Sequence, residues 1–387
     1  MGRKSQKPLL TIFLVVFFDL LAFGIVIPIL PYYSKTFGAS ALELGWLMAA
    51  YSIAQFAFSP FWGGLSDRIG RRPVLLLTIL AGACSMVATA LAGSYLMLFF
   101  ARLAAGAFAA NISTASAYIA DITPPEDRAK GMGIIGASFG LGFIFGPAIG
   151  GIFSVYGYAT PILMAAALGL ANFFFAYFVL AESAEHREPS GKKLSSANID
   201  ATFSSAATAI PVGLFFLNTL AFTQLEVVFG LFVLMRFGFD ALHAGWLLAG
   251  IGVVSAILQG GLIGRLAKKF GERNLLVVGF LLLALSLVGA AFAPRPEIFM
   301  VSLFFLAVGS GLVNPSLSSL VSKGAPISRR GSVMGVYQSA GSLSRVLGPP
   351  AAGFLFDRLG PSSPLLLSAA IMGAGLIGAL LGRRKLA

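Results

Sequence analysis

Twelve long apolar runs follow one another along the chain, and this feature constrains its fold more than any other. A run of about 20 apolar residues crosses the hydrocarbon core of a bilayer as one α-helix. Only 11% of the residues are charged, against roughly 25% in an ordinary soluble domain. The first run is too long, and is followed too closely by others, to be a cleaved signal peptide. The runs are 9–31, 44–66, 74–93, 95–119, 131–156, 159–181, 209–234, 244–266, 274–293, 297–321, 332–356 and 361–381. The sequence therefore predicts an all-α polytopic membrane protein with 12 transmembrane helices.

The basic residues are distributed unevenly between the loops. With the N-terminus placed in the cytoplasm, 21 of the 27 lysines and arginines fall in inner segments and four in outer loops. The other two, Arg102 and Arg345, fall inside apolar runs. By the positive-inside rule this distribution places both termini in the cytoplasm. The net charge of +12 therefore reflects membrane topology, and no nucleic-acid partner is expected.

The two halves of the chain repeat each other, with an offset that drifts from 200 to 203 residues. The matched pairs are ALELGWL (41–47) with ALHAGWL (241–247), Gly63 with Gly264, Asn111 with Asn314, and Gly146 with Gly348. Self-similarity at a fixed offset is typical of a duplicated structural unit. We therefore expect two pseudo-symmetric six-helix bundles of the same orientation, 1–181 and 209–387, joined by the polar cytoplasmic linker 182–208.

Four motifs occur in a characteristic order, namely GGLSDRIGRRPVLL, RLAAG, AYIADITPPEDRAKG and GASFGLGFIFGPAIGG. In this order the chain resembles the major facilitator superfamily, within it the twelve-helix drug:proton antiporters, and most closely the tetracycline efflux branch. The resemblance implies a site between the two bundles near mid-membrane. It also implies a small-molecule substrate exchanged for protons, no cofactor, no metal, and a monomer in the lipid bilayer of the bacterial inner membrane.

The motif GASFGLGFIFGPAIGG places six glycines and a proline in sixteen residues of one apolar run. Glycine costs roughly 1 kcal/mol at each helical position and proline about 3. Glycines four residues apart form a smooth stripe on a helix, against which another backbone packs closely in lipid. Close packing alone explains the stripe, and the resemblance adds a role in sealing the outer side of the cavity. The candidate gating residues are Gly136, Gly140, Gly146, Pro147 and Gly150.

The loop GGLSDRIGRR is a second gating candidate. Gly63 permits close approach, and the carboxylate of Asp67 suits the positive end of a neighbouring helix. An ordinary positive-inside loop explains the arginines but not the aspartate or the glycines. The resemblance implies a latch between inward- and outward-facing states. The candidate latch residues are Gly63, Asp67, Arg68, Arg71 and, at the end of the fourth run, Asp121, which Arg68, Arg71 or Arg72 is expected to meet.

Four ionisable residues lie well inside apolar runs: Asp19, Arg102, Glu226 and Arg345. Each costs roughly 2.5–3.5 kcal/mol at the centre of an isolated helix, so partners or water must offset this. Each half holds one acid and one base, and we expect the pairs Asp19–Arg102 and Glu226–Arg345. A static ion pair that fixes helix register is the alternative to a proton-carrying role. Proton coupling is assigned mainly to Asp19 and cation preference mainly to Glu226.

Uncharged polar groups in the apolar runs are candidates for the substrate cavity. They are Asn111, Asn218, Gln224, Gln259, Asn314 and Gln338. The repeat-matched Asn111 and Asn314 are expected to face each other across the pseudo-two-fold axis. The resembled tetracycline exporters carry aspartates where this chain has Ser85 and Leu283. An amphipathic substrate other than tetracycline is therefore favoured.

Three function classes are compatible with these residues. Proton-coupled drug efflux is favoured, and a uniporter or symporter for a sugar, organic acid or other metabolite is the alternative. A transporter-like receptor that binds without transport is the third. No phosphate loop, cysteine/histidine metal cluster or nucleophilic triad is recognisable, so an enzyme is not expected.

Overall fold

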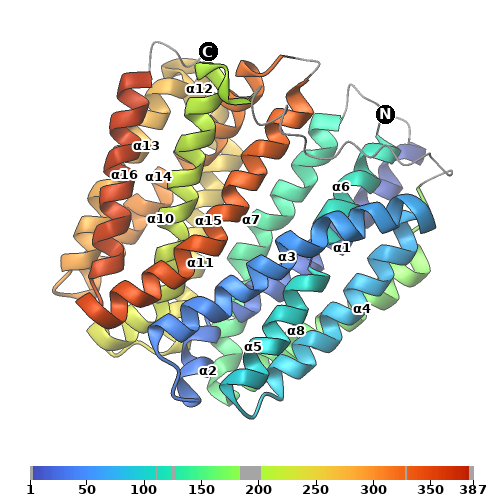
Figure 1. Ribbon diagram of the computed structural model, residues 1–387, viewed down its shortest axis with the longest axis horizontal. Helices are drawn as coiled ribbons and strands as arrows, with labels where there is room; N and C mark the ends of the chain where they lie inside the picture. Colours follow the sequence, from blue (N-terminus) through green and yellow to red (C-terminus); the bar gives the residue numbers. More distant parts are fainter. Residues whose placement is uncertain (1–2, 110, 124–127, 184–201, 327–328, 383–387) are drawn as a thin grey trace. The chain divides into compact units, whose positions relative to one another are not determined.

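The computed structural model describes residues 3–109, 111–123, 128–183, 202–326 and 329–382 (Figure 1). These residues form helices, and no β-strand occurs among them. The elements are α1 (Arg3–Val26), α2 (Leu30–Thr36), α3 (Ala41–Ile69), α4 (Arg71–Ala90), α5 (Tyr95–Phe108), α6 (Asn111–Ile122), α7 (Arg128–Phe153), η2 (Ser154–Tyr156), α8 (Ala159–Val179), α10 (Ala206–Phe237), α11 (Ala241–Ile257), η3 (Leu258–Leu262), α12 (Ile263–Phe270), α13 (Glu272–Phe292), α14 (Pro296–Gly324), α15 (Arg330–Leu359) and α16 (Ser363–Gly382).

Ten of the described helical segments are long and apolar enough to cross a membrane, and Gly140–Tyr156 forms a shorter apolar helix. The fourth predicted run is divided into α5 and α6, and the first and the eighth are interrupted for local reasons. The first ends at Val26, because Pro28 has no N–H to continue the helical hydrogen bonds, and α2 begins at Leu30. The eighth contains the π-helical turn η3, of sequence LQGGL, between α11 and α12. The prediction of an all-α polytopic membrane protein is confirmed.

The chain divides into two compact units. Unit 1 comprises Met1–Ala39, Ala50–Gly191 and Phe239–Ala249, and unit 2 comprises Ser40–Ala49, Lys192–Gly238 and Gly250–Ala387. Each unit is built mainly from one half of the sequence, but it also takes the first turns of one helix from the other half. The first turns of α3 belong to unit 2, and those of α11 belong to unit 1. The expected boundaries at residues 181 and 209 stay a prediction.

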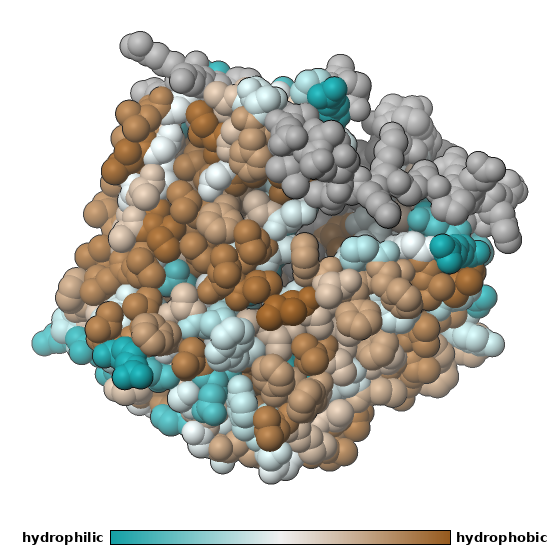
Figure 2. All heavy atoms as spheres, viewed as in Figure 1, coloured by the Kyte–Doolittle hydropathy of each residue, from teal (hydrophilic) through white to brown (hydrophobic). Residues whose placement is uncertain are grey.

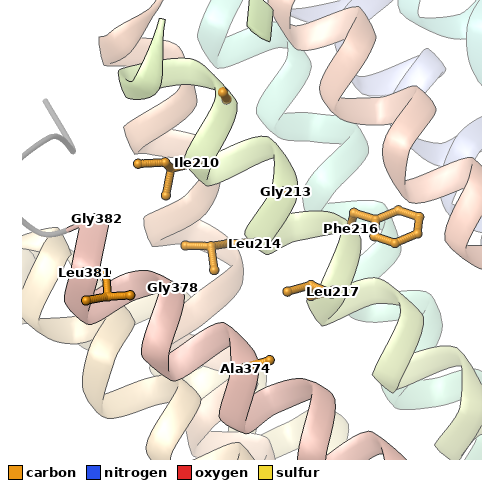
Figure 3. Close-up of a pocket in the computed structure, with 10 residues that line it drawn as sticks. Ile210, Gly213, Leu214, Phe216, Leu217, Ala374, Gly378, Leu381 and Gly382 are labelled. Atoms are coloured by element: carbon orange, nitrogen blue, oxygen red, sulfur yellow. The ribbon is translucent and has the colours of Figure 1, made fainter.

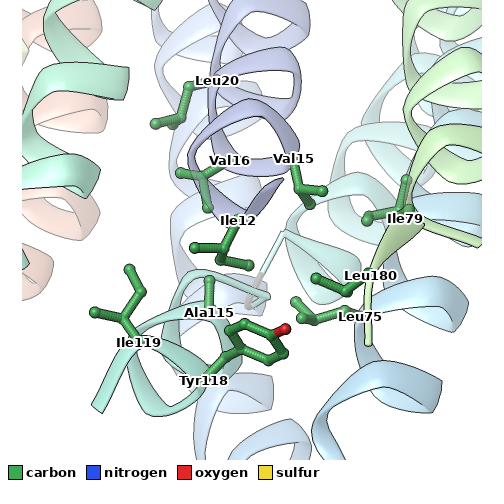
Figure 4. Close-up of a cluster of buried hydrophobic side chains, with 11 residues drawn as sticks. Ile12, Val15, Val16, Leu20, Leu75, Ile79, Ala115, Tyr118, Ile119 and Leu180 are labelled. Carbon is green, nitrogen blue, oxygen red and sulfur yellow. The ribbon is translucent and has the colours of Figure 1, made fainter. Parts of the chain in front are cut away.

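A core of unit 1 forms where α1, α4, α6 and α8 meet (Figure 4). The side chains of Ile12 and Ile119 are completely buried there. Asn172 of α8 donates a hydrogen bond from Nδ2 to the carbonyl of Val15, at 2.9 Å, which fixes α8 against α1. The buried members of this core are Ile12, Val15, Val16, Leu20, Leu75, Ile79, Ala115, Tyr118, Ile119, Ala176 and Leu180.

Large apolar side chains are also abundant on the outside of the helices (Figure 2). Phe100 is 63% exposed, Phe178 77% and Leu381 79%. Soluble monomers rarely expose contiguous apolar surface on this scale. In a bilayer the same side chains face lipid at no cost, which is the surface that the apolar runs predict.

Candidate functional site

The loop between α3 and α4 carries the network around Arg71, the first residue of α4. Its Nη1 lies 2.6 Å from Asp67 Oδ1, and its Nε lies 3.1 Å from Asp121 Oδ2 at the end of α6. Nη1 also donates to Ser66 Oγ at 2.6 Å. One guanidinium therefore ties the end of α3 to the end of α6 through charge-assisted hydrogen bonds, which are roughly twice as strong as neutral ones.

The other predicted latch residues take different positions. Arg68 is exposed, and Arg72 donates from Nη2 to the carbonyl of Tyr177 at 2.7 Å. Arg71 is thus the arginine that meets Asp121. The expectation of a close approach at Gly63 is wrong for the described residues, because nothing lies within 4 Å of a Cβ built there.

Glu182 completes this network, and sequence reasoning missed it. Its carboxylate accepts hydrogen bonds from the backbone N–H groups of Arg71, at 2.9 Å, and Arg72, at 3.1 Å. The residue before α4 is Gly70, with φ of 102° and no side chain to cap the helix. A Cβ at Gly70 would lie 2.5 Å from Glu182 Oε2, so the glycine makes room for the carboxylate. The available signal was a capless helix start together with an acid just after the sixth apolar run.

The glycine stripe of α7 packs on α1. A Cβ at Gly142 would lie 2.9 Å from the carbonyl carbon of Leu20, and one at Gly146 would lie 2.6 Å from Gly24 Cα. A Cβ at Gly150 would meet the carbonyl oxygen of Ile25. Both helices belong to unit 1. The stripe 142–146–150 therefore brings two backbones together, as its four-residue spacing predicts.

The remaining gating candidates on α7 do not share this contact. Nothing lies within 4 Å of a Cβ built on Gly140, so the expected close approach is wrong there for the described residues. The surroundings of Gly136 lie outside the described part. The carbonyl of Pro147 faces Gly245 of α11, where a Cβ would lie 2.5 Å from it. Gly151, which was not predicted as a gate, also meets the start of α11, because a Cβ there would lie 3.1 Å from the carbonyl of Ala241.

Two predicted cavity residues meet in unit 2. Asn218 of α10 donates from Nδ2 to Oδ1 of Asn314 on α14, at 3.0 Å, and Asn314 Nδ2 donates to Ser310 Oγ at 3.1 Å. Asn218 is 5% exposed. The facing of Asn314 towards Asn111 stays a prediction, because the side chain of Asn111 lies outside the described part.

The four intramembrane charges differ in their surroundings. Arg102 is 3% exposed, and its guanidinium carbon lies 4.6 Å from the ring centroid of Tyr51, a cation–π contact that the sequence did not indicate. Asp19 and Glu226 are partly buried, whereas Arg345 is exposed. The pairs Asp19–Arg102 and Glu226–Arg345 stay predictions.

A family model described as Major Facilitator Superfamily matches residues 12–269 and 213–386. The chain belongs to the Major Facilitator Superfamily. It is 30% identical over 385 residues to the class D tetracycline resistance protein of Salmonella ordonez, covering 97% of this chain and 96% of that protein. It is 31% identical over 391 residues to multidrug resistance protein 2 of Bacillus subtilis, with the same two coverages.

A solved structure supports the same membership. The human organic anion transporter MFSD10 matches this transporter with a TM-score of 0.72 at 25% identity, over 98% of this chain and 100% of that one. The predicted resemblance to the superfamily and its efflux branch is confirmed, and so is the twelve-helix facilitator fold.

The other predicted cavity residues of the transporter lie on three different helical elements. Gln224 of α10 is 1% exposed, and within the described part its Oε1 accepts no hydrogen bond. Gln259 is exposed within η3, and Gln338 is exposed on α15. Within the described part, no hydrogen bond joins any two of these three side chains.

A groove of about 580 Å³ lies between α10 and α16 of the transporter (Figure 3). It is lined by Ala209, Ile210, Gly213, Leu214, Phe216, Leu217, Ala374, Gly378, Leu381 and Gly382. None of these is a predicted cavity residue, and none carries a polar side chain. The groove therefore offers no polar side chain that would orient a polar substrate.

Proposed function

We propose that this transporter exports small amphipathic compounds in exchange for protons by alternating access. The similarity to tetracycline and multidrug resistance proteins over nearly the whole chain supports this function. The observation that carries the coupling lies in α1. Asp19 is a partly buried acid in a membrane-spanning helix, and the next residue, Leu20, packs on Gly142 of the α7 stripe. A proton taken up by Asp19 thus acts on the helix that packs directly on the gating helix.

Glu226 is proposed to set a preference for cationic substrates. It lies eight residues beyond Asn218 on α10, which is about 12 Å along the helix axis. The Asn218–Asn314 pair offers neutral hydrogen-bonding groups at one level, and the carboxylate offers charge at another. A cation with an apolar body suits such a site, because few fixed polar points and one charge select by shape and sign.

Tetracycline itself is not the proposed substrate. Ser85 donates its hydroxyl to the carbonyl of Ala81 in its own helix, at 2.8 Å, and Leu283 is 1% exposed. Neither side chain is an acid, so neither replaces the aspartates expected from the resembled branch. We propose a multidrug or related amphipathic range instead.

The transporter is proposed to act as a monomer in the bacterial inner membrane, with both termini in the cytoplasm. The distribution of lysines and arginines between the loops supports this orientation. In this orientation the Arg71 network lies on the cytoplasmic side, and the starts of α3 and α11 lie on the outer side.

Transport into proteoliposomes under an imposed pH gradient tests the proposal, with one cationic and one neutral amphipathic substrate. Asp19→Asn is expected to stop uphill transport of both but retain downhill exchange, because an amide does not cycle a proton. Glu226→Gln is expected to weaken binding of the cationic substrate by roughly 1–3 kcal/mol and to leave binding of the neutral one unchanged. Glu297→Gln, an exposed acid at the start of α14, is the matched control.

Transport by the unaltered protein that ignores collapse of both the pH gradient and the membrane potential would instead identify a uniporter. If Glu226→Gln abolishes transport of both substrates while Asp19→Asn still transports them uphill, Glu226 is the proton carrier and Asp19 is not.

A further inference from the structure

The last turn of α15 places a carboxylate on the first turn of α3. Asp357 Oδ1 accepts from the backbone N–H of Ala41 at 3.2 Å, and Oδ2 accepts from that of Leu42 at 2.8 Å. The first N–H groups of a helix have no partner within the helix, and they attract negative charge. All of these groups belong to unit 2, although 316 positions of sequence separate Ala41 from Asp357.

The two backbones are also in close contact along this edge. A Cβ at Gly353, one turn before Asp357, would meet the carbonyl of Ala41 and lie 2.6 Å from Leu42 Cα. A Cβ at Gly45, one turn further along α3, would lie 2.8 Å from the carbonyl carbon of Pro349. The contact therefore runs over two turns of each helix and ends at the carboxylate.

The repeat-related contact between α7 and α11 has the glycines but not this carboxylate. A Cβ at Gly245 would lie 2.8 Å from Gly151 Cα, which repeats the close approach. Both helix starts are also capped within their own chain segments. His243 N–H donates to Asp240 Oδ1 at 3.0 Å in α11, and Glu43 N–H donates to Ser40 Oγ at 3.2 Å in α3. The repeat places Val155, which is 60% exposed, where α15 has Asp357.

We propose that Asp357 is a positioning residue that latches the first turn of α3 to the last turn of α15 and stabilises the arrangement in which these outer helix ends are in contact. The inference rests on the proposed alternating access and orientation. The first turns of α3 are grouped with Asp357 in unit 2, and the same helix continues into unit 1 from Ala50 onward. A movement of α3 as one rigid helix, away from α15, therefore separates Ala41 and Leu42 from the carboxylate. The carboxylate stabilises only the arrangement in which the two helix ends are in contact, and its loss shifts the population towards the one in which they are apart.

A cysteine at the contact reports this population directly. The variant is Ala41→Cys, at a position 3% exposed, in a Cys84→Ser background because Cys84 is exposed. The measurement is the rate of modification by a membrane-impermeant maleimide in right-side-out vesicles of the full-length protein. Asp357→Ala is expected to raise this rate about ten-fold and Asp357→Asn by less, since the amide keeps one acceptor but no charge.

A second substitution separates a latch from a simple helix cap. Ser40→Asp adds a carboxylate at the cap position of α3 itself, as Asp240 does for α11. Combined with Asp357→Ala, it is expected to restore thermal stability while labelling stays fast. An unchanged labelling rate in Asp357→Ala, or a rate returned to normal by Ser40→Asp, would overturn the latch. Faster labelling seen only in inside-out vesicles would also overturn it, because Ala41 would then lie on the cytoplasmic side of the membrane. The assay needs neither substrate nor proton gradient, so its failure is distinct from failure of the proposed transport function.

Discussion

Replacing Gly146 by alanine tests the stripe with the smallest possible side chain. The added Cβ would lie 2.6 Å from both Cα and the carbonyl carbon of Gly24, and ordinary contact begins at 3.4 Å. Since both opposing atoms are backbone, α1 and α7 must separate there by about 0.8 Å. Overpacking of this kind costs typically 1–3 kcal/mol. The helix-propensity gain from glycine to alanine, about 1 kcal/mol, offsets part of this.

Gly140→Ala is the matched control, because it brings the same propensity gain on the same helix but meets nothing within 4 Å. We expect Gly146→Ala to be less stable than Gly140→Ala by roughly 1–3 kcal/mol. Thermal unfolding in one detergent measures the difference, and proton-driven transport in proteoliposomes measures its effect on gating. Equal melting temperatures for the two variants, with equally tight coupling, would refute the assignment of the stripe to α1–α7 packing.

Three further predictions follow from the described contacts. Glu182→Ala removes the carboxylate that caps α4 and is expected to lower the free energy of unfolding by about 0.5–2 kcal/mol. Thermal unfolding measures this loss, with exposed Glu297→Ala as control, and equal effects of the two variants would exclude the cap. Desolvation raises the pKa of Asp240, but hydrogen bonds from His243 lower it more, so its net pKa lies below the ordinary 3.8. Asp240 therefore stabilises the fold above about pH 3.8, and this contribution is lost as the pH falls through its lowered pKa. The melting temperatures of the wild type and Asp240→Asn should converge at that acidic end and differ above it. A difference that stays constant with pH would contradict this. In a double-mutant cycle for substrate affinity, Asn218→Ala and Asn314→Ala should be non-additive, and simple additivity would place the two amides in separate roles.

The sequence by itself determined that the chain lies in a lipid bilayer, that its two halves repeat each other, and which family it belongs to. Apolar runs of bilayer length leave few alternatives, because a backbone in lipid must satisfy its own hydrogen bonds. The motif order around GGLSDRIGRR and GASFGLGFIFGPAIGG indicated the superfamily, and the family model and the relatives confirm it. The sequence also predicted that an arginine of that loop meets Asp121, and the structure shows that this arginine is Arg71.

Only the tertiary structure decided which surfaces meet. The four-residue spacing of glycines predicts a smooth face, but it does not say which helix that face meets, and Gly140 and Gly146 differ for this reason. The cap of α4 by Glu182 joins positions 111 residues apart, and the cap of α3 by Asp357 joins positions 316 apart. Each acid looks like an ordinary charged residue at the end of an apolar run. The backbone N–H groups it binds carry no signature in the sequence, because every helix start offers them and only the packing of the helices selects the partner.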